Sequence, residues 1–259
     1  MEECLLYSDP ELYDVLFPSA REAAALTDEG RKSRILASNQ FYLEEAGRGG
    51  GRVLELACGS GRLTVQLAQN GIDIMGADLS ATMLDAALAK AAAAGLPVEF
   101  LLADMRSFDF GRQFSTILIP GNSLLHLLTI EDLKRCLACV RGHLVEGGRL
   151  VFDVSKWDVS VLARQPETRY PVLTAGQITV EETAHYDSAK QIRHITWFFS
   201  FLDAPDYRVA RYDLRVIFPE ELLLLLDCAG FRLEARYGEF TRVAFEDSSP
   251  RQVCVARAG

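Results

Sequence analysis

The chain has 259 residues, and its 27 Lys and Arg against 36 Asp and Glu give a formal net charge of -9. Hydrophobic residues make up 49% and charged residues 24%, a composition that supports a buried core without disulfides or a structural metal and excludes a disordered or fibrous protein. An acidic chain lacks the clustered positive charge that binds a nucleic-acid backbone or an anionic membrane surface. We therefore expect a small-molecule partner, with no nucleic acid and no membrane.

The N-terminal residues 1–6 do not have a basic stretch followed by a long apolar run, and the leucine run 222–226 is too short to cross a bilayer. These features predict a cytoplasmic protein. Six cysteines are scattered along the chain, and only Cys136 and Cys139 form a C-x-x-C pair, inside an amphipathic helical pattern that favours packing over redox chemistry. Because nothing completes a tetrahedral zinc site around this pair, the sequence predicts no metal there.

Residues 1–50 are predicted to form a helical cover. An amphipathic helix spans residues 28–46, and an aromatic segment, 7–17, precedes it. The aromatic residues of that segment include Tyr7, Tyr13 and Phe17. We expect these side chains to close over a bound ligand, with the alternative that they anchor the first helix in the core.

From residue 52 the sequence alternates short apolar runs with helical stretches, which is the pattern of a parallel sheet covered on both faces. The predicted strands are 52–57, 72–77, 98–102, 115–119 and 149–154; the predicted helices are 62–70, Ser80 to before Gly95, and Thr129 to Gly147, with Leu144 on the apolar stripe of the last. A helix at 219–229 and two strands at 231–237 and 252–257 follow later. The fold class is therefore α/β, a doubly wound Rossmann-like sheet of seven strands built from residues 51–154 and 219–259.

Residues 155–218 are predicted to form an antiparallel β insertion after the fifth strand. Its β-rich runs, 177–186, 192–202 and 207–218, are separated by short polar breaks. Alternation predicts that Ile195, Trp197, Phe199 and Phe201 share one face. It predicts that Tyr212, Leu214, Val216 and Phe218 share another. We expect the insertion to cover the substrate, with Trp157 and Trp197 in contact with it. A homodimer contact or a structural appendage is the alternative, because an apolar sheet face must be covered by something.

The most informative segment is ELACGSGR, residues 55–62, in which an acidic strand residue precedes a glycine turn and a helix. Glycines let the backbone approach a ligand closely, and a helix N-terminus presents unpaired N–H groups to an anion. A dinucleotide fingerprint requires Gly or Ala where this chain has Thr64, which disfavours NAD and FAD. The chain also lacks the phosphate-binding G-x-x-x-x-G-K-[ST] pattern of ATP sites.

Three motifs occur in order, VLELACGSG at 53–61, GADLSATML at 76–84 and LADM at 102–105. Together they resemble the class I S-adenosylmethionine-dependent methyltransferases, and the resemblance extends over almost the whole chain. The segments GNSLLHL at 121–127 and GGRLVFDV at 147–154, with residues 240–250, are similar to a bacterial small-molecule branch of that family.

The resemblance implies S-adenosylmethionine as cofactor and S-adenosylhomocysteine as product. Such a site needs acceptors for the amine, N–H donors for the carboxylate and a carboxylate for the ribose diol. Asp78 would bind the ribose and Asp104 the adenine amino group, while Glu55 would orient the methionine amine. The implied cofactor residues are Tyr13, Glu55, Ala57, Gly59, Gly61, Asp78, Leu79, Met83, Ala103, Asp104, Met105 and Pro120.

Three of the implied cofactor residues also have a purely structural interpretation. Asp78 is also suited to the first turn of a helix beside Ser80, and Asp104 to a turn. Met83, on an alanine-rich helix, is also suited to the core.

The reaction implied is an in-line transfer of a methyl group to an N or O atom of a small molecule, in which proximity supplies much of the acceleration. Asn122 and His126 follow the fourth strand and would share a helical face, Asn122 orienting the acceptor and His126 accepting a proton. The alternative for His126 is a core residue, since leucines surround it. Pro120-Gly121-Asn122 stands where metal-dependent relatives place carboxylates, so we expect no metal.

Two other functions remain open from the sequence. One is a non-catalytic S-adenosylmethionine-binding protein, because intact binding motifs do not prove turnover. The other is a dinucleotide-dependent oxidoreductase on a similar sheet, which Thr64 disfavours.

Overall fold

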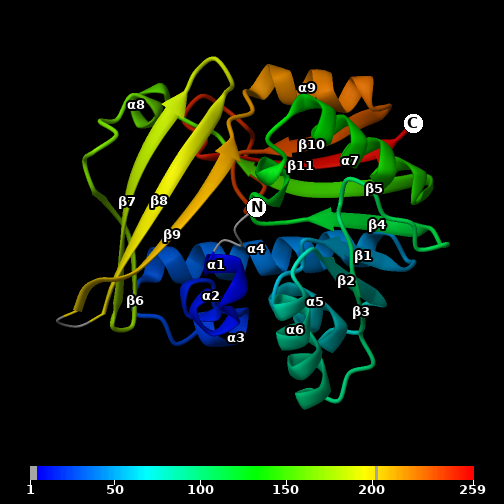
Figure 1. Ribbon diagram of the computed structural model, residues 1–259. Helices are drawn as coiled ribbons and strands as arrows, with labels where there is room; N and C mark the ends of the chain where they lie inside the picture. Colours follow the sequence, from blue (N-terminus) through cyan, green and yellow to red (C-terminus); the bar gives the residue numbers. More distant parts are fainter. Residues whose placement is uncertain (1–4, 202–203) are drawn as a thin grey trace.

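The computed structural model describes residues 5–201 and 204–259 (Figure 1). Four expectations concern positions outside the described residues: the start of the helical cover, Cys4, the last residue of the predicted strand 192–202, and Asp203 in the break that follows it.

The larger sheet has seven strands. They are β1 (Val53–Leu56), β2 (Ile74–Asp78), β3 (Glu99–Leu102), β4 (Phe114–Ile119), β5 (Leu144–Ser155), β10 (Phe231–Tyr237) and β11 (Arg251–Ala258). Their order is β10-β11-β5-β4-β1-β2-β3. The five central strands pair in parallel, whereas β11 is antiparallel to both β5 and β10. The predicted doubly wound α/β sheet is confirmed, and its order reverses between β1 and β4, where ligands bind in folds of this kind.

Helices cover both faces of this sheet (Figure 1). They are α4 (Glu29–Arg48), α5 (Arg62–Gln69), α6 (Ala81–Ala93), α7 (Ile130–Gly142) and α9 (Pro219–Cys228), with a short 3-10 helix η1 (Ser123–His126). Phe41 and Tyr42 of α4 and Leu63 of α5 pack with one set of alternating strand residues. Leu137 of α7 and Leu226 of α9 pack with the other set. This alternation is why the sheet can be buried on both faces.

The predicted helix from Thr129 to Gly147 is wrong at its end. The α7 helix ends at Gly142, and Leu144 instead begins β5, where it pairs with Phe114. The apolar stripe correctly indicated that Leu144 is buried. It is buried as a strand residue in the sheet, however, and not as part of the helix. Spacing along a sequence does not distinguish burial by a helix from burial by a strand that begins nearby.

The insertion is an antiparallel sheet of four strands. They are β6 (Tyr170–Ala175), β7 (Ile178–Asp187), β8 (Ile192–Phe201) and β9 (Ala204–Arg215), preceded by α8 (Val159–Leu162). The sequence predicted the last three strands but not β6, of whose six residues only Ala175 is buried, so that it carries little apolar alternation.

The prediction of two separate faces is wrong, because Ile195 is the direct partner of Tyr212 and the Trp197 and Tyr212 rings lie 5.5 Å apart on one face. The alternation within each set holds in the centre of the insertion and not at its ends. Ile195, Trp197 and Phe199 are buried together, but Phe201 is 39% exposed. β9 ends before Val216, and Phe218 is the N-cap of α9 and 37% exposed, because the chain turns here into a helix led by Pro219.

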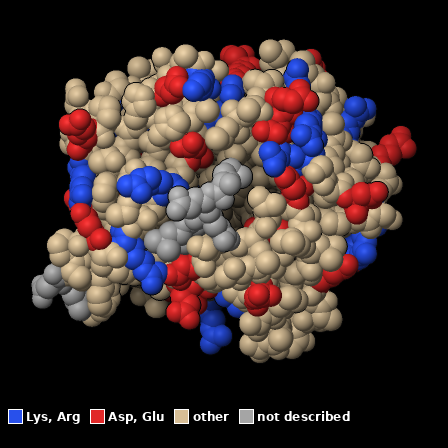
Figure 2. Space-filling model, viewed as in Figure 1, with Lys and Arg blue, Asp and Glu red and all other residues tan. Residues whose placement is uncertain are grey.

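Three short helices, α1 (Leu5–Ser8), α2 (Pro10–Leu16) and α3 (Ala20–Ala23), lie between the insertion and α6 (Figure 1). The first contacts both β9 and α6, and α2 contacts α6. The buried face of the insertion joins the same core as the sheet and these helices, so it is covered within one chain. Among the described residues no helix is both long and apolar enough to span a membrane. On the face shown in Figure 2, basic and acidic side chains are interspersed.

Candidate functional site

The turn between β1 and α5 has a backbone that favours glycine. Ala57, Gly59 and Gly61 have φ values of 54°, 55° and 74°, in the left-handed region. A Cβ on Gly61 would lie 2.7 Å from the Cβ of Ala87, so this glycine allows α5 to pack against α6. A larger side chain at position 61 would therefore clash within the protein itself. At Gly59 a Cβ would instead face the Tyr13 ring, at 3.8 Å.

Asp78 is the last residue of β2, and its carboxylate is hydrogen-bonded to the glycine turn that follows β1. Its carboxylate accepts from the backbone N–H of Gly59 at 2.7 Å and of Ser80 at 2.9 Å. Burial raises the pKa of Asp78, and these two hydrogen bonds oppose the shift. The residue thus has its structural role at the start of α6 and, in addition, a direct contact with the glycine turn.

Glu55 lies inside β1 and is 2% exposed. The hydroxyl of Thr64, which is fully buried, donates to its Oε2. Burial raises the pKa of Glu55 to about 7, against the effect of that hydrogen bond. Thr64, the residue that departs from the dinucleotide pattern, therefore serves to hold this carboxyl group.

The residues predicted to line the adenine lie at the same sheet edge, but they differ in exposure and in ion pairing. The N–H of Ala103 donates to the carbonyl of Asp78 at 2.8 Å, which brings the two strand ends together. Leu79 is 63% exposed, whereas Met83 is buried in the packing of α6. Asp104 is ion-paired with Arg106 at 2.6 Å, and this guanidinium lowers the pKa of Asp104.

Met105 and Pro120 complete the set that the sequence predicted at this edge. Met105 packs partly buried against the main core, and Pro120 is buried directly after β4. Leu102, at the end of β3, is 64% exposed and was not predicted. Its exposure beside the end of β2 leaves an apolar surface at the sheet edge, a property that a strand pattern does not indicate.

The chain after β4 is fixed by two side-chain acceptors. Asn122 accepts through Oδ1 from the N–H of Ser155 at 2.7 Å, and Asp153 accepts from the N–H of Gly121 at 2.8 Å. Asp153 also accepts from the hydroxyl of Tyr42 at 2.5 Å. Sequence reasoning missed Tyr42 and the role of Asp153 as a shared acceptor, although a carboxylate at the end of an apolar strand is a signal, since it requires buried partners.

His126 forms a hydrogen bond with Tyr7, whose hydroxyl lies 2.9 Å from its Nε2. Burial lowers the pKa of His126 to about 4, so the imidazole is uncharged at neutral pH, unlike the near-neutral titration that the sequence led us to expect. The predicted shared helical face with Asn122 is wrong. Asn122 has a φ of 67° and precedes η1, because the turn after β4 is left-handed.

Trp197 and Trp157, the two tryptophans of the insertion, both contact the buried ion pair of Glu182 and Arg193. Trp197 is 7% exposed and donates through Nε1 to Glu182 at 3.0 Å, and Glu182 pairs with Arg193 at 2.5 Å. The Arg193 guanidinium in turn stacks over the Trp157 ring, 4.5 Å from its centroid. The arrangement places Trp197 on the inner face of the insertion sheet.

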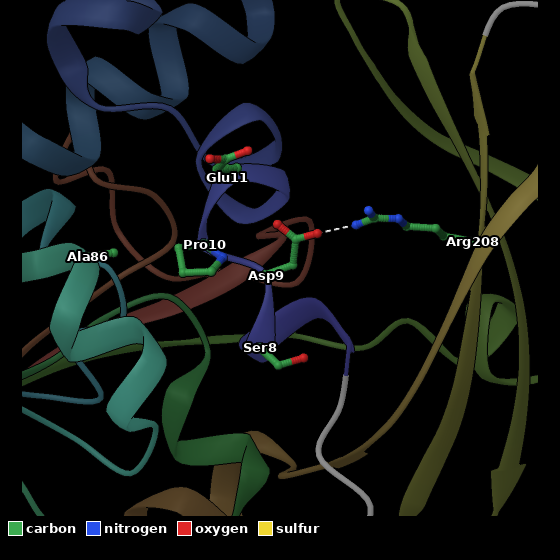
Figure 3. Close-up of a pocket in the computed structure, with 6 residues that line it drawn as sticks. All are labelled: Ser8, Asp9, Pro10, Glu11, Ala86 and Arg208. Atoms are coloured by element: carbon green, nitrogen blue, oxygen red, sulfur yellow. Dashed lines mark hydrogen bonds and ion pairs between the residues drawn. The ribbon is translucent and has the colours of Figure 1, made fainter.

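An open pocket of about 620 Å³ lies between the helical cover, α6 and the insertion. Its lining residues are Ser8, Asp9, Pro10, Glu11, Ala86 and Arg208 (Figure 3). Asp9 points across it to Arg208, and the two form an ion pair that joins the cover to β9.

Comparisons with known proteins agree with this architecture. A protein-family model described as a methyltransferase domain matches residues 53–148. The chain is similar to the putative methyltransferase YqeM of Bacillus subtilis, with 30% identity over 74% of this chain and 77% of that protein. It is 26% identical to a glycine/sarcosine N-methyltransferase of Halorhodospira halochloris, over 84% of this chain and 79% of that one.

A further relative and a solved structure extend the comparison. A putative methyltransferase of Geobacillus is 36% identical over 116 residues, and the match spans less than half of each protein, 44% of this chain and 47% of the relative. The structure of the CcbJ methyltransferase from Streptomyces caelestis is similar with a TM-score of 0.77 and 26% identity, over 86% of this chain and 90% of that one. With the seven-stranded topology and the glycine turn, these matches show that the chain belongs to the class I S-adenosylmethionine-dependent methyltransferases.

Proposed function

We propose that the chain transfers a methyl group from S-adenosylmethionine to an amine nitrogen of a small molecule. The observation that carries the proposal is the position of Tyr7. Its carbonyl accepts a hydrogen bond from the hydroxyl of Ser80, just after β2, and its own hydroxyl is hydrogen-bonded to His126, after β4. A hydrogen-bonded pair in which His126 is uncharged suits a neutral amine nucleophile. The similarity to a glycine/sarcosine N-methyltransferase over most of both chains supports nitrogen over oxygen.

The residues at the sheet edge fit the cofactor of this family. Glu55 is a buried carboxyl group that an ammonium would stabilise in its charged form, and Asp78 lies at the turn with an acceptor for a ribose hydroxyl. The exposed Leu79 offers an apolar surface for the adenine ring. Asp104 would accept from the adenine amine in addition to Arg106, since a carboxylate has room for several donors.

The remaining predicted cofactor residues keep supporting roles in this proposal. Ala57, Gly59 and Gly61 would present the turn to the cofactor carboxylate, and Tyr13 would cover it from above. Ala103, Met105 and Pro120 would line the edge, and Met83 would support it from within α6.

The cofactor supplies an electrophilic methyl group, and the chain's own residues bring the acceptor to it and exclude water. Asn122 fixes the end of β5 through Ser155 and so sets the position of the segment that carries His126. With a pKa of about 4, His126 is a weak base at neutral pH, so we assign it and Tyr7 to orienting the amine by hydrogen bonds. Proximity is then the main source of acceleration.

The proposal is tested by incubating the protein with methyl-labelled S-adenosylmethionine and paired sets of small amines and their hydroxyl analogues. Label should enter amines, with one S-adenosylhomocysteine formed for each methyl transferred, and His126→Asn should slow transfer while cofactor affinity is kept. Label confined to the hydroxyl compounds would refute nitrogen as the acceptor. Cofactor binding without turnover on any acceptor would favour the non-catalytic alternative.

We further propose that residues 155–218 cover the acceptor and that the protein works in the cytoplasm. The five cysteines among the described residues are unpaired, which suits a reducing compartment. A homodimer remains a prediction that sedimentation would check, and the insertion does not need one to cover its apolar face.

A further inference from the structure

Six aromatic side chains contact one another in a closed series, which we call the aromatic circuit. In order, they are Tyr7, Tyr13, Phe17, Trp197, Tyr212 and His126, and His126 returns to Tyr7. The distances between consecutive ring centroids are 6.3, 4.9, 6.4, 5.5, 6.3 and 5.2 Å. These spacings are typical of favourable aromatic pairs.

The aromatic circuit joins three parts of the molecule that are distant in sequence. The helical cover provides three members, the insertion provides Trp197 and Tyr212, and η1 provides His126. On one side Tyr13 lies against Gly59 of the proposed cofactor turn. The circuit therefore begins at the cofactor edge and reaches the sheet that we propose as the acceptor cover.

The members are packed less completely than the aromatic residues of the core. Phe114, Phe152 and Phe199 are fully buried. By contrast, five members of the circuit are only partly buried, and Trp197 is the exception. These rings therefore pack against the core and still keep some accessible surface.

The circuit presents uncharged rings. Burial lowers the pKa of His126 to about 4 and raises that of Tyr13 to about 12, so neither carries a charge at neutral pH. Glu182 touches the circuit at the Trp197 Nε1 and is ion-paired with Arg193. Glu55, Asp78 and Asp14 act electrostatically on Tyr13, at the cofactor end of the circuit. Aromatic ring faces attract cations in addition to such carboxylates.

We propose that the aromatic circuit is the acceptor site and that it selects aliphatic amines by cation–π contacts. This inference rests on the proposed function. In the transfer, the nitrogen lone pair forms the new N–C bond, the S–C bond breaks and its electron pair stays on sulfur as a neutral thioether. The positive charge therefore passes from sulfur to nitrogen, and the product ammonium loses its proton to solvent afterwards. Aromatic faces stabilise that charge at the place where it develops.

The test is calorimetry with the protein saturated with S-adenosylhomocysteine. The two probes are tetramethylammonium and tert-butanol, which is similar in size and uncharged. We expect the cation to bind on the order of tenfold more tightly than the alcohol. Tyr212→Leu and Phe17→Leu should each reduce this preference severalfold, because they keep apolar bulk and remove a ring face. The matched control is Tyr207→Leu, on the same strand as Tyr212 but outside the circuit and 39% exposed, and it should leave the preference unchanged.

Equal affinity of the wild-type protein for the two probes would overturn the proposal, as would an equal effect of Tyr207→Leu. Circular dichroism identifies a variant that is unfolded. In that case the cation preference of the other circuit variant tests the proposal. If S-adenosylhomocysteine itself does not bind the wild-type protein, the proposed function fails. If it binds and the cation preference is absent, the circuit alone is rejected.

Discussion

Glu55 makes the stability of the protein depend on pH. Its pKa rises to about 7 from 4.5 on burial, so the folded state binds a proton more tightly than the unfolded chain does. The stabilising effect of that proton is fully present below about pH 4.5 and is lost as the pH rises through about 7. We expect Glu55→Gln to remove this loss, which amounts to roughly 3 kcal/mol in free energy of unfolding for a shift of this size.

Urea denaturation at several pH values measures this effect in the cofactor-free protein. The difference in free energy of unfolding between Glu55→Gln and the wild type should grow in favour of the variant between about pH 4.5 and 7. Parallel curves for the two proteins over that range would show that Glu55 does not titrate in this way.

Asp78 makes one observed contact and one proposed contact, and we expect the loss of both to lower the affinity for the cofactor. Asp78→Ala removes the acceptor that holds the Gly59 N–H at 2.7 Å and the acceptor proposed for the ribose. We expect the affinity for S-adenosylhomocysteine to fall roughly ten- to a hundredfold, for a loss of about 1.5–3 kcal/mol. Titration calorimetry measures it.

The matched control is Asp73→Ala, because Asp73 precedes the same strand at its other end and is largely exposed. Its affinity should equal that of the wild type. Wild-type binding by a folded Asp78→Ala protein would remove Asp78 from the proposed site.

The helix α4 is tied to the sheet through polar contacts as well as apolar ones. Tyr42 donates to the buried Asp153, which also fixes the turn after β4 and pairs with Arg251 at 3.2 Å. Glu45 on the same helix is fully buried and pairs with Arg149 of β5 at 3.0 Å. The Tyr42–Asp153 contact connects the helical layer to the strand ends of the proposed site, whereas the Glu45–Arg149 pair connects it to the part of the sheet where β1 begins.

Tyr42→Phe removes one donor from Asp153 and leaves the ring in place. We expect the free energy of unfolding to fall by about 1–3 kcal/mol, because a buried carboxylate that loses a donor retains its desolvation cost. Chemical denaturation measures the change. Tyr207→Phe, on an exposed part of β9, should change it by less than about 0.5 kcal/mol; equal effects in the two variants would contradict the role of Asp153.

The helical cover and the insertion are joined to each other by two arginines. Arg208 pairs with Asp9 across the open pocket (Figure 3). Arg31 of α4 is buried and donates to the carbonyls of Thr174 in β6 at 3.1 Å and of Leu16 in α2 at 2.5 Å. The parts that would enclose an acceptor are therefore coupled through side chains.

Arg31→Ala should loosen this coupling more than it lowers global stability. We expect faster amide hydrogen exchange in α2 and β6, with little change in β1 and β4, because the lost hydrogen bonds lie at the edge of the core. Arg34→Ala, at an exposed position of the same helix, is the control. Uniform acceleration throughout the sheet would indicate global destabilisation, and no change in α2 would refute the coupling.

The sequence determined the fold class and the position of the glycine turn after the first strand. Alternation of apolar runs with helical stretches predicts a doubly wound sheet, since both periodicities are local properties of the chain. The glycine turn, Glu55 and Asp78 could be placed in the same way, because each lies at the end of a strand whose position the pattern predicts. The local failures were a boundary at Leu144, where burial is satisfied by two structures equally well, the missed strand β6, and the turn at Asn122, whose left-handed backbone the pattern did not indicate.

Tertiary structure alone decided the partners of these residues and the shape of the proposed acceptor site. Tyr7 and His126 are 119 positions apart, and Tyr42 and Asp153 are 111 apart, so no periodicity connects them. The lowered pKa of His126 and the raised pKa of Glu55 follow from burial by elements remote in sequence. Even at Gly61 the requirement for glycine comes partly from a neighbour, Ala87 on the next helix, whose Cβ would lie 2.7 Å from an added Cβ. Such contacts depend on packing in three dimensions, which local patterns make possible but do not specify.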